Sequence, residues 1–337
     1  MIEIRGCRPM RIAGGAAALG GAMLFAWSIR RAGAAEVLEG VRRIGAGMII
    51  VVCLGGLRGL LRTVAWRLCL DPEHQRPLAS LFSAYLGGDA IGNVTPFGFL
   101  ISEPSKIVLV RRRIDVPASV AALTVENLVY GATVVLMLVA GTGAFLLSFA
   151  VPPPIRIASI ATLVTALMLA AAAAWILVAR RRVVSGAVEW LIARGIAAEF
   201  LQERLPSIRQ AGDRIFDFAT RRRSAVLPLV ALEVLYHLTA IAEIWFALAL
   251  ITGTPPPVLT AFVLEYVNRT ITVVFQFVPM WLGVDEAGTS LATGVLHLGS
   301  APGVSLALVR KARVLVWTAA GIALLIHRSA KELGIQN

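Results

Sequence analysis

Long apolar stretches alternate with short polar connections along most of the chain. Residues 12–29, 157–179 and 287–309 carry no charged side chain. Because a helix of about 20 apolar residues spans the hydrocarbon core of a bilayer, we predict an all-α, multi-pass membrane bundle with about seven to nine membrane segments. The predicted helices cover residues 11–30, 44–70, 78–95, 117–148, 156–180, 224–252, 258–278, 288–299 and 303–327.

Residues 183–223 follow a different pattern. Charged and apolar residues alternate here with helical spacing, as at Val188, Leu191 and Ile192. The pattern favours one or two amphipathic helices that lie along the cytoplasmic headgroups, with a plain connecting loop as the alternative. Together with this connecting segment, residues 1–337 form a single predicted transmembrane domain.

Two predicted helices end in a similar motif. The first window, residues 93–106, reads NVTPFGFLISEPSK, and the second, residues 275–291, reads FQFVPMWLGVDEAGTSL. In each window a proline stands seven positions before a glutamate, and a glycine lies between them. This suggests a weak internal repeat around residues 78–113 and 258–299. The motif supplies the helix-break residues Pro96, Gly98, Pro279 and Gly283, and the acids Glu103, Asp285 and Glu286.

These motifs predict two broken or re-entrant helices around a central cavity. Proline removes a backbone hydrogen bond, and glycine permits the turn that follows. Broken backbone cannot face lipid, because its polar groups would lack hydrogen-bond partners. An acid at the break would cost roughly 3 kcal/mol or more in the hydrocarbon centre. The alternative is that both windows are ordinary cytoplasmic loops with solvated acids.

Further charged and polar residues interrupt the apolar helices. Such residues are rare inside membranes, are usually paired and often mark a pathway for substrate or ions. Glu265 and Arg269 form a favourable i, i+4 pair, so they could also simply neutralise each other. The candidate cavity residues from the helices are Arg58, Arg62, Glu126, Asn127, Glu265, Arg269, Arg310 and Arg313.

Opposite charges from different helices should pair inside the bundle. Glu233, Tyr236 and His237 also share one face of the helix predicted at 224–252, and Glu243 follows them. We read His237 as a packed side chain and not as a metal ligand. The expected ion pairs join Arg58 and Arg62 to Glu103 or Glu126, and Arg313 to Glu286.

The composition agrees with a membrane protein. The chain is 58% hydrophobic and 15% charged, whereas soluble domains carry about 25% charged residues. The net charge is +12, but most arginines lie in short connections such as residues 110–113. The positive-inside rule places such connections in the cytoplasm, so the charge does not indicate nucleic-acid binding.

The same rule orients most of the bundle. The proline-rich turns at residues 151–156 and 252–257 carry almost no charge and should face away from the cytoplasm. The connection at residues 30–43 conflicts with this scheme, because it carries four arginines and yet is placed outside.

Several kinds of chemistry lack their motifs. The sequence has no G-x-x-x-x-G-K-[ST] loop and no G-x-S-x-G nucleophile motif. Its histidines and its cysteines, Cys7, Cys53 and Cys69, do not have the spacing of metal ligands. We therefore expect no metal site, no cofactor and no enzymatic activity.

Four segments carry a resemblance to a known family. They read RTVAWRLCL, GNVTPFGFLISEPSKIVLVRR, FVPMWLGVDEAGTSLATGVLHLG and LVRKARVLVW. The chain resembles the transmembrane, flippase-like domain of the lysylphosphatidylglycerol synthase superfamily over nearly its whole length. It is also similar to members associated with hopanoid lipid biosynthesis. The full synthases carry a soluble aminoacyl-transferase domain after the membrane part, whereas this chain ends ten residues beyond the last predicted helix. We therefore expect the transport module alone.

The resemblance implies a multi-pass protein of a bacterial-type inner membrane that moves a lipid between leaflets. In this hypothesis, arginines bind an anionic headgroup, while Glu103, Asp285 and Glu286 hold the arginines in place. Membrane lipids are the expected partners, with lipid-biosynthesis proteins as further candidates and no nucleic acid. The alternatives are a secondary transporter of a small solute, coupled to protons through Glu126 or Glu233, and a non-catalytic membrane scaffold.

Overall fold

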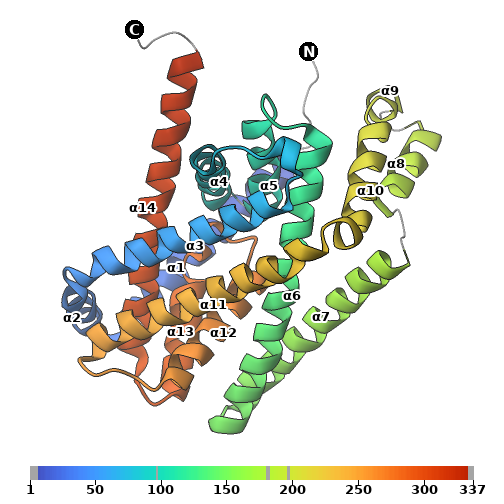
Figure 1. Cartoon of the computed structure of the whole chain (residues 1–337). Coiled ribbons are helices and arrows are strands. Elements are labelled where there is room, and N and C mark those ends of the chain that lie inside the picture. The colour runs from blue at the N-terminus through green and yellow to red at the C-terminus, as the bar shows by residue number, and fades with distance from the viewer. Residues whose placement is uncertain (1–6, 96–97, 180–182, 196–197, 333–337) are drawn as a thin grey trace.

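The computed structural model describes residues 7–95, 98–179, 183–195 and 198–332. These residues form helices joined by short connections and contain no strand, so the predicted all-α fold is confirmed (Figure 1). Two 3₁₀ turns are η1 (Pro72–His74) and η2 (Pro279–Trp281). The α-helices are α1 (Cys7–Ala32), α2 (Ala34–Ile44), α3 (Gly47–Cys69), α4 (Leu78–Asn93), α5 (Gly98–Val110), α6 (Val116–Ser148), α7 (Pro153–Val178), α8 (Val183–Ala193), α9 (Ala198–Gln202), α10 (Leu205–Arg221), α11 (Arg223–Thr252), α12 (Val258–Val274), α13 (Val284–Val295) and α14 (Ser300–Glu332).

Four helices in the described part of the chain are long and apolar enough to cross a membrane. They are α3, α6, α7 and α11, and each matches a predicted helix to within a few residues. Helix α14 has 33 residues but carries Arg310, Lys311 and Arg313 near its middle. The helices support a membrane-embedded bundle, and the total of seven to nine segments stays a prediction.

Some predicted boundaries are wrong. Most of the connection predicted at residues 30–43 is helix α2, which buries Val37 and Ile44. The helix predicted to reach residue 278 ends at Val274. Helix α13 begins at Val284, four residues earlier than predicted, and its first turn therefore includes Asp285 and Glu286. Carboxylates are favourable at that position, where the helix dipole presents its positive end.

Both motif windows form a pair of short helices with a break between them. Helices α4 and α5 have 16 and 13 residues, and α12 and α13 have 17 and 12. At about 1.5 Å per residue, none of the four crosses a hydrocarbon core of about 30 Å unaided. Pro96 lies outside the described residues. The sequence repeat between the two windows stays a prediction.

Glycines bring α5 back against α4. A Cβ atom at Gly88 would lie 2.9 Å from the carbonyl oxygen of Ser102, and one at Gly92 would lie 2.9 Å from that of Gly98. Only a residue without a side chain permits this approach. The hairpin thereby holds Gly98 and the polar side chains of α5 beside α4.

The segment predicted as amphipathic, residues 183–223, contains α8, α9 and α10. Helix α10 packs on α6, and Arg209 pairs with Glu189 of α8 at 2.9 Å.

Helix α2 is amphipathic as well. Its Gly40 lies against Ile251 of α11, next to the uncharged 252–257 turn. The connection at 30–43 therefore lies at the same end of the bundle as this turn, and its side of the membrane stays a prediction.

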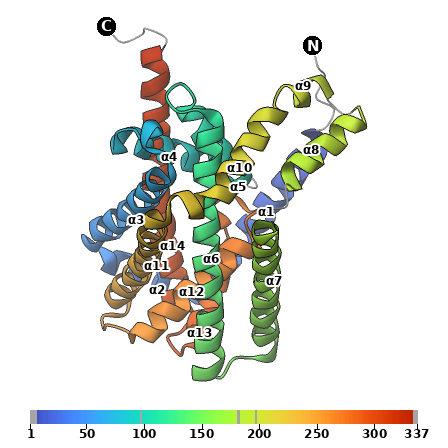
Figure 2. The same cartoon turned by 45° about the vertical axis from the view of Figure 1, so that its right-hand side comes forward.

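The apolar core is built mainly from α3, α6, α11, α12 and α14. Its fully buried members include Val51, Leu138, Leu248, Leu264 and Leu306. Helix α7 lies beside α6 at the edge of the bundle in both views (Figure 2). It exposes most of its apolar side chains, as expected for a helix that faces lipid.

Candidate functional site

The two breaks border the same cavity, which has a volume of about 470 Å³. Thr95 and Gly98 line it from the first break, and Pro279 and Met280 from the second. Met280 has a φ of 51°, which is uncommon for a residue other than glycine. The cavity is strongly charged: its lining includes Arg58, Arg62, Lys106, Arg269, Arg310, Lys311 and Arg313, together with Asp89, Glu103 and Asp285.

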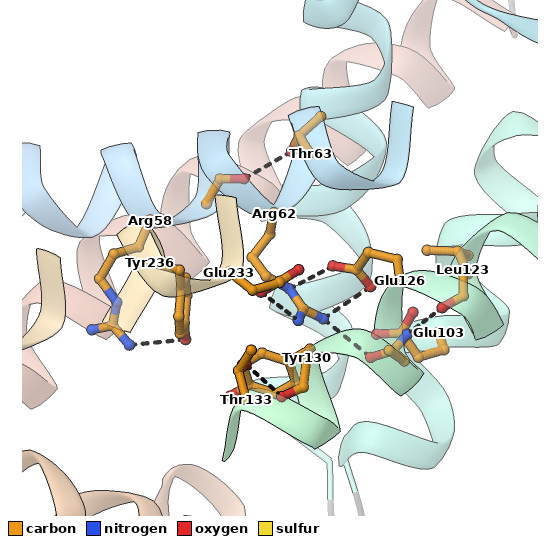
Figure 3. A network of polar contacts seen from close by, with 12 residues as sticks. Arg58, Arg62, Thr63, Glu103, Leu123, Glu126, Tyr130, Thr133, Glu233 and Tyr236 are labelled. Atoms are coloured by element: carbon orange, nitrogen blue, oxygen red, sulfur yellow. Dashed lines mark hydrogen bonds and ion pairs between the residues drawn. The ribbon is translucent and has the colours of Figure 1, made fainter. Parts of the chain in front are cut away.

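Arg62 of α3 lies between two buried carboxylates (Figure 3). Its Nε lies 2.8 Å from Oε1 of Glu126, and its Nη2 donates to Oε2 at 3.1 Å. Nη2 also donates to Oδ1 of Asn127 at 3.1 Å. On the other side, Nη1 lies 3.5 Å from Oε2 of Glu233. The guanidinium carbon stands 4.0 Å from the centre of the Tyr130 ring, which is a cation–π contact.

Arg58, one turn earlier on α3, shares its acid with Arg313 of α14. Nη1 of Arg58 lies 3.3 Å from Oε2 of Glu243, and Nη1 of Arg313 contacts the same oxygen. Nη2 of Arg58 donates to the Tyr236 hydroxyl at 2.9 Å. In the described part of the chain, no other carboxylate lies within ion-pair distance of either arginine. This group therefore carries one more positive than negative charge.

Lys106 of α5 has the opposite balance. Its Nζ lies 3.0 Å from Oδ1 of Asp89 and 2.9 Å from Oε1 of Glu103. The lysine side chain is 3% exposed, whereas those of Asp89 and Glu103 are 36% and 30% exposed. The two acids can therefore contact water or a ligand in the cavity.

Glu265 and Arg269 form a local pair on α12. Nε of Arg269 donates to Oε1 of Glu265 at 2.6 Å, and Asn268 donates to the other carboxylate oxygen. Nη1 of Arg269 donates to the Tyr130 hydroxyl at 2.8 Å. The predicted i, i+4 pair is present, and it also positions Arg269 on the cavity wall.

The adjacent acids Asp285 and Glu286 tie α13 to α14. Oδ1 of Asp285 accepts from Nη2 of Arg310 at 2.6 Å. Oε2 of Glu286 accepts from the backbone N–H of Gly283 at 2.7 Å, and its Oε1 lies 2.6 Å from Nζ of Lys311. Nη1 and Nε of Arg310 are buried and make no hydrogen bond with the described residues. Asp285 lines the cavity, whereas Glu286 is fully buried behind it.

Comparison with known proteins assigns the family. The model of the lysylphosphatidylglycerol synthase TM region matches residues 11–321. The chain belongs to this family. No curated protein and no solved structure gives a significant match.

The pairing expected within this TM region is correct for Arg62, which contacts Glu126. It is wrong for Arg58, which pairs with Glu243 instead of Glu103 or Glu126, and for Arg313, which also pairs with Glu243. Glu286 pairs with Lys311. Successive helical residues point about 100° apart, so Lys311 faces α13 while Arg313 faces α3 and α11.

Sequence reasoning missed Asp89 and Lys106, which line the cavity, and it assigned no partner to Glu243. A signal was present in each case. Asp89 is an acid inside an apolar helix, Lys106 is one of three lysines in the chain, and Glu243 interrupts the apolar run of α11. What the sequence does not supply is the position of these residues relative to helices distant in the chain.

One group outside the cavity has the geometry of metal ligands. Asp71, Glu73 and His74 place one ligand atom each within 4.8 Å of one another. Asp71 already contacts Arg214 at 3.6 Å, and His74 contacts Glu73 at 3.4 Å. Since side chains on the protein supply these contacts, we assign no metal to this surface loop.

Proposed function

We propose that this protein moves an anionic phospholipid between the two leaflets of a membrane. In this proposal the cavity binds the headgroup, the acyl chains remain in the bilayer, and no covalent bond of the lipid is made or broken. The family match supports a membrane protein related to lipids, and the cavity chemistry supports an anionic ligand.

The observation that carries the proposal is the positive surplus at Arg58 and Arg313. Arg58 and Arg313 line the cavity, and their guanidinium groups share the Oε2 atom of Glu243 behind it. Guanidinium groups bind phosphate with directed, charge-assisted hydrogen bonds. Arg310 adds Nη1 and Nε groups that lack a hydrogen-bond partner in the described residues. A phosphate at this position would balance the surplus charge.

The remaining lining suits an amphiphilic ligand. Besides the charged groups, Leu86, Ala90, Val273, Val314 and Trp317 border the same cavity. A ligand with a charged head and apolar chains could contact both kinds of surface, whereas a small polar solute would leave the apolar part unused. This favours a lipid over a small solute.

The test is leaflet translocation in proteoliposomes. Purified protein would be reconstituted with labelled phosphatidylglycerol, an aminoacylated form, a polyprenyl phosphate and a hopanoid. The decisive variant is Arg58→Gln, because it removes the surplus charge while it leaves the Glu243–Arg313 pair in place. Hydrogen bonds to charged groups contribute about 1.5–3 kcal/mol, so we expect translocation to slow about 10- to 100-fold.

Arg209→Gln, which changes a half-exposed arginine on α10, is the matched control and should translocate at the wild-type rate. Vesicles loaded with inorganic phosphate would test the transport of small anions. If correctly folded wild-type protein moves neither phosphatidylglycerol nor the polyprenyl phosphate, the proposal is rejected. Phosphate uptake without lipid movement would support a small-solute transporter instead.

A further inference from the structure

We propose that Glu126 and Glu233, the two acids that face Arg62, carry the protons that couple lipid movement to the proton gradient. This inference rests on the lipid translocation proposed above and adds the energy source. It starts from the unequal number of charges around Arg62, where one guanidinium faces two carboxylates.

The two carboxylates are not equivalent. Glu126 forms a two-point contact with Arg62, through Nε at 2.8 Å and Nη2 at 3.1 Å. Within the described residues, Glu233 has only the 3.5 Å contact with Nη1, and neither of its oxygens has a well-formed hydrogen bond. Figure 3 shows the guanidinium of Arg62 between the two acids, with more of its contacts on the Glu126 side. Arg62 therefore neutralises Glu126 first.

Among the described residues, Arg62 is the only cation within ion-pair distance of Glu233. Arg58, one turn away on α3, is engaged by Glu243 and the Tyr236 hydroxyl. Lys106 of α5 is the next cation toward Glu126, but it contacts Asp89 and Glu103. Arg222, at the start of α11, donates to the backbone carbonyl of Leu70. The other titratable groups around this cluster are Tyr85 of α4, Tyr130 of α6, the Cys69 thiol of α3, and Tyr236 and His237 of α11.

Burial determines whether Glu233, the second acid at Arg62, is ionised or protonated. The side chains of Glu126 and Glu233 are 2% and 1% exposed, respectively, so water does not solvate them. An isolated buried carboxylate is so costly that the group takes up a proton instead. Glu233 is thus the position where the cluster holds a proton.

The cavity connects this proton to the lipid. Arg62 lines the cavity while Glu126 and Glu233 lie behind it. A phosphate that binds Arg62 from the cavity side competes with both acids for the same guanidinium. Glu126 then loses its counter-charge and takes up a second proton, while Glu233 keeps the first. A lipid phosphodiester carries one negative charge, and one proton compensates it. The site should therefore move an anionic lipid and a proton together.

The first test imposes a pH difference of one unit across proteoliposomes that contain labelled phosphatidylglycerol, with the membrane potential clamped. One proton per lipid corresponds to about 1.4 kcal/mol, so the leaflet ratio of the lipid should shift up to about 10-fold. In the double variant Glu126→Gln/Glu233→Gln the lipid should still equilibrate but show no shift with the gradient, because neither position can take up a proton. Glu203→Gln, an exposed acid at 82% side-chain exposure, is the control and should behave as wild type.

The outcomes separate the two proposals. Lipid movement that ignores the gradient in wild type overturns proton coupling and leaves translocation standing. A Glu126→Gln/Glu233→Gln variant that keeps the full shift overturns the assignment of the protons to these two acids. Absence of any lipid movement in wild type rejects the translocase itself.

A second measurement does not depend on transport. Infrared spectra of the purified protein at neutral pH should contain a protonated-carboxyl band that shifts on exchange into D₂O. This band should be absent from both Glu233→Gln and Glu126→Gln. In each variant the one remaining acid pairs with Arg62 and stays ionised. Should neither variant fold, the wild-type spectrum still decides, since a spectrum without the band overturns the proposal.

Discussion

Glu286 has two roles at a single position. One carboxylate oxygen accepts from the Gly283 backbone N–H, and the other pairs with Lys311. The acid is fully buried and does not line the cavity. The sequence predicted that Glu286 holds the arginines of a cavity. In the structure, Glu286 instead fixes the start of α13 against α14. Asp285, its neighbour, contacts Arg310 and reaches the cavity.

We therefore predict that Glu286→Gln destabilises the protein. Glutamine can still accept from Gly283, but it leaves Lys311, whose side chain is 11% exposed at the cavity, without a counter-charge. Breaking a fully buried pair costs about 3–5 kcal/mol, and we expect a smaller loss here. The midpoint of thermal unfolding in detergent should fall. The double variant Glu286→Gln/Lys311→Met should recover part of the loss because it removes the unpaired charge. A midpoint equal to that of wild type would contradict the role assigned to this pair.

At the scale of elements, the second break depends on one glycine. Gly283 has a φ of 81° and lies against the backbone of Gly21 and Phe25 in α1. The break is thereby locked between α1 and α14, and it holds Met280 and Asp285 at the cavity. Both breaks were predicted from the proline and glycine positions. The contact with α1 was not, because nothing in the local sequence indicates which helix lies opposite.

Gly283→Ala should therefore disturb the fold. A positive φ costs roughly 1–2 kcal/mol for a residue with a Cβ, and the new methyl group would also collide with the Gly21 backbone. We expect a lower unfolding midpoint and a smaller monodisperse fraction in size-exclusion chromatography. Gly143→Ala on α6, where a Cβ would meet nothing within 4 Å, is the control and should behave as wild type. Equal profiles for the two variants would show that the close approach to α1 is not needed.

At the scale of the whole molecule, the bundle has two kinds of accessible surface. Helix α7 exposes apolar side chains at the edge of the bundle, whereas the cavity exposes charged groups inside it. In a membrane the first surface should contact lipid and the second should contain water. The two surfaces can be distinguished by the reactivity of a thiol, because only a hydrated thiol ionises readily.

In a variant without Cys7, Cys53 and Cys69, a cysteine at Thr272 should react with a charged, water-soluble thiol reagent, since Thr272 lines the cavity. A cysteine at Ile157, 68% exposed on α7, should be protected by lipid and react only after the protein is unfolded. Labelling of membrane vesicles followed by mass spectrometry measures both. Faster reaction at Ile157 than at Thr272 would contradict this placement of water and lipid.

The sequence by itself determined the helical membrane character, the extents of α3, α6, α7 and α11, and the position of the two breaks. These features depend on local properties of the sequence, which are hydropathy, proline geometry and the period of one helical turn. The i, i+4 pair of Glu265 and Arg269 was predictable for the same reason.

Only the tertiary structure decided which charges meet. Arg58, Glu243 and Arg313 come from α3, α11 and α14, and their contact depends on how three helices rotate and cross. The unequal numbers of acids and bases around Arg62 and Glu243 arise in the same way. Ion pairing acts over a few ångströms in space, and the sequence specifies those distances only through the packing of the whole bundle.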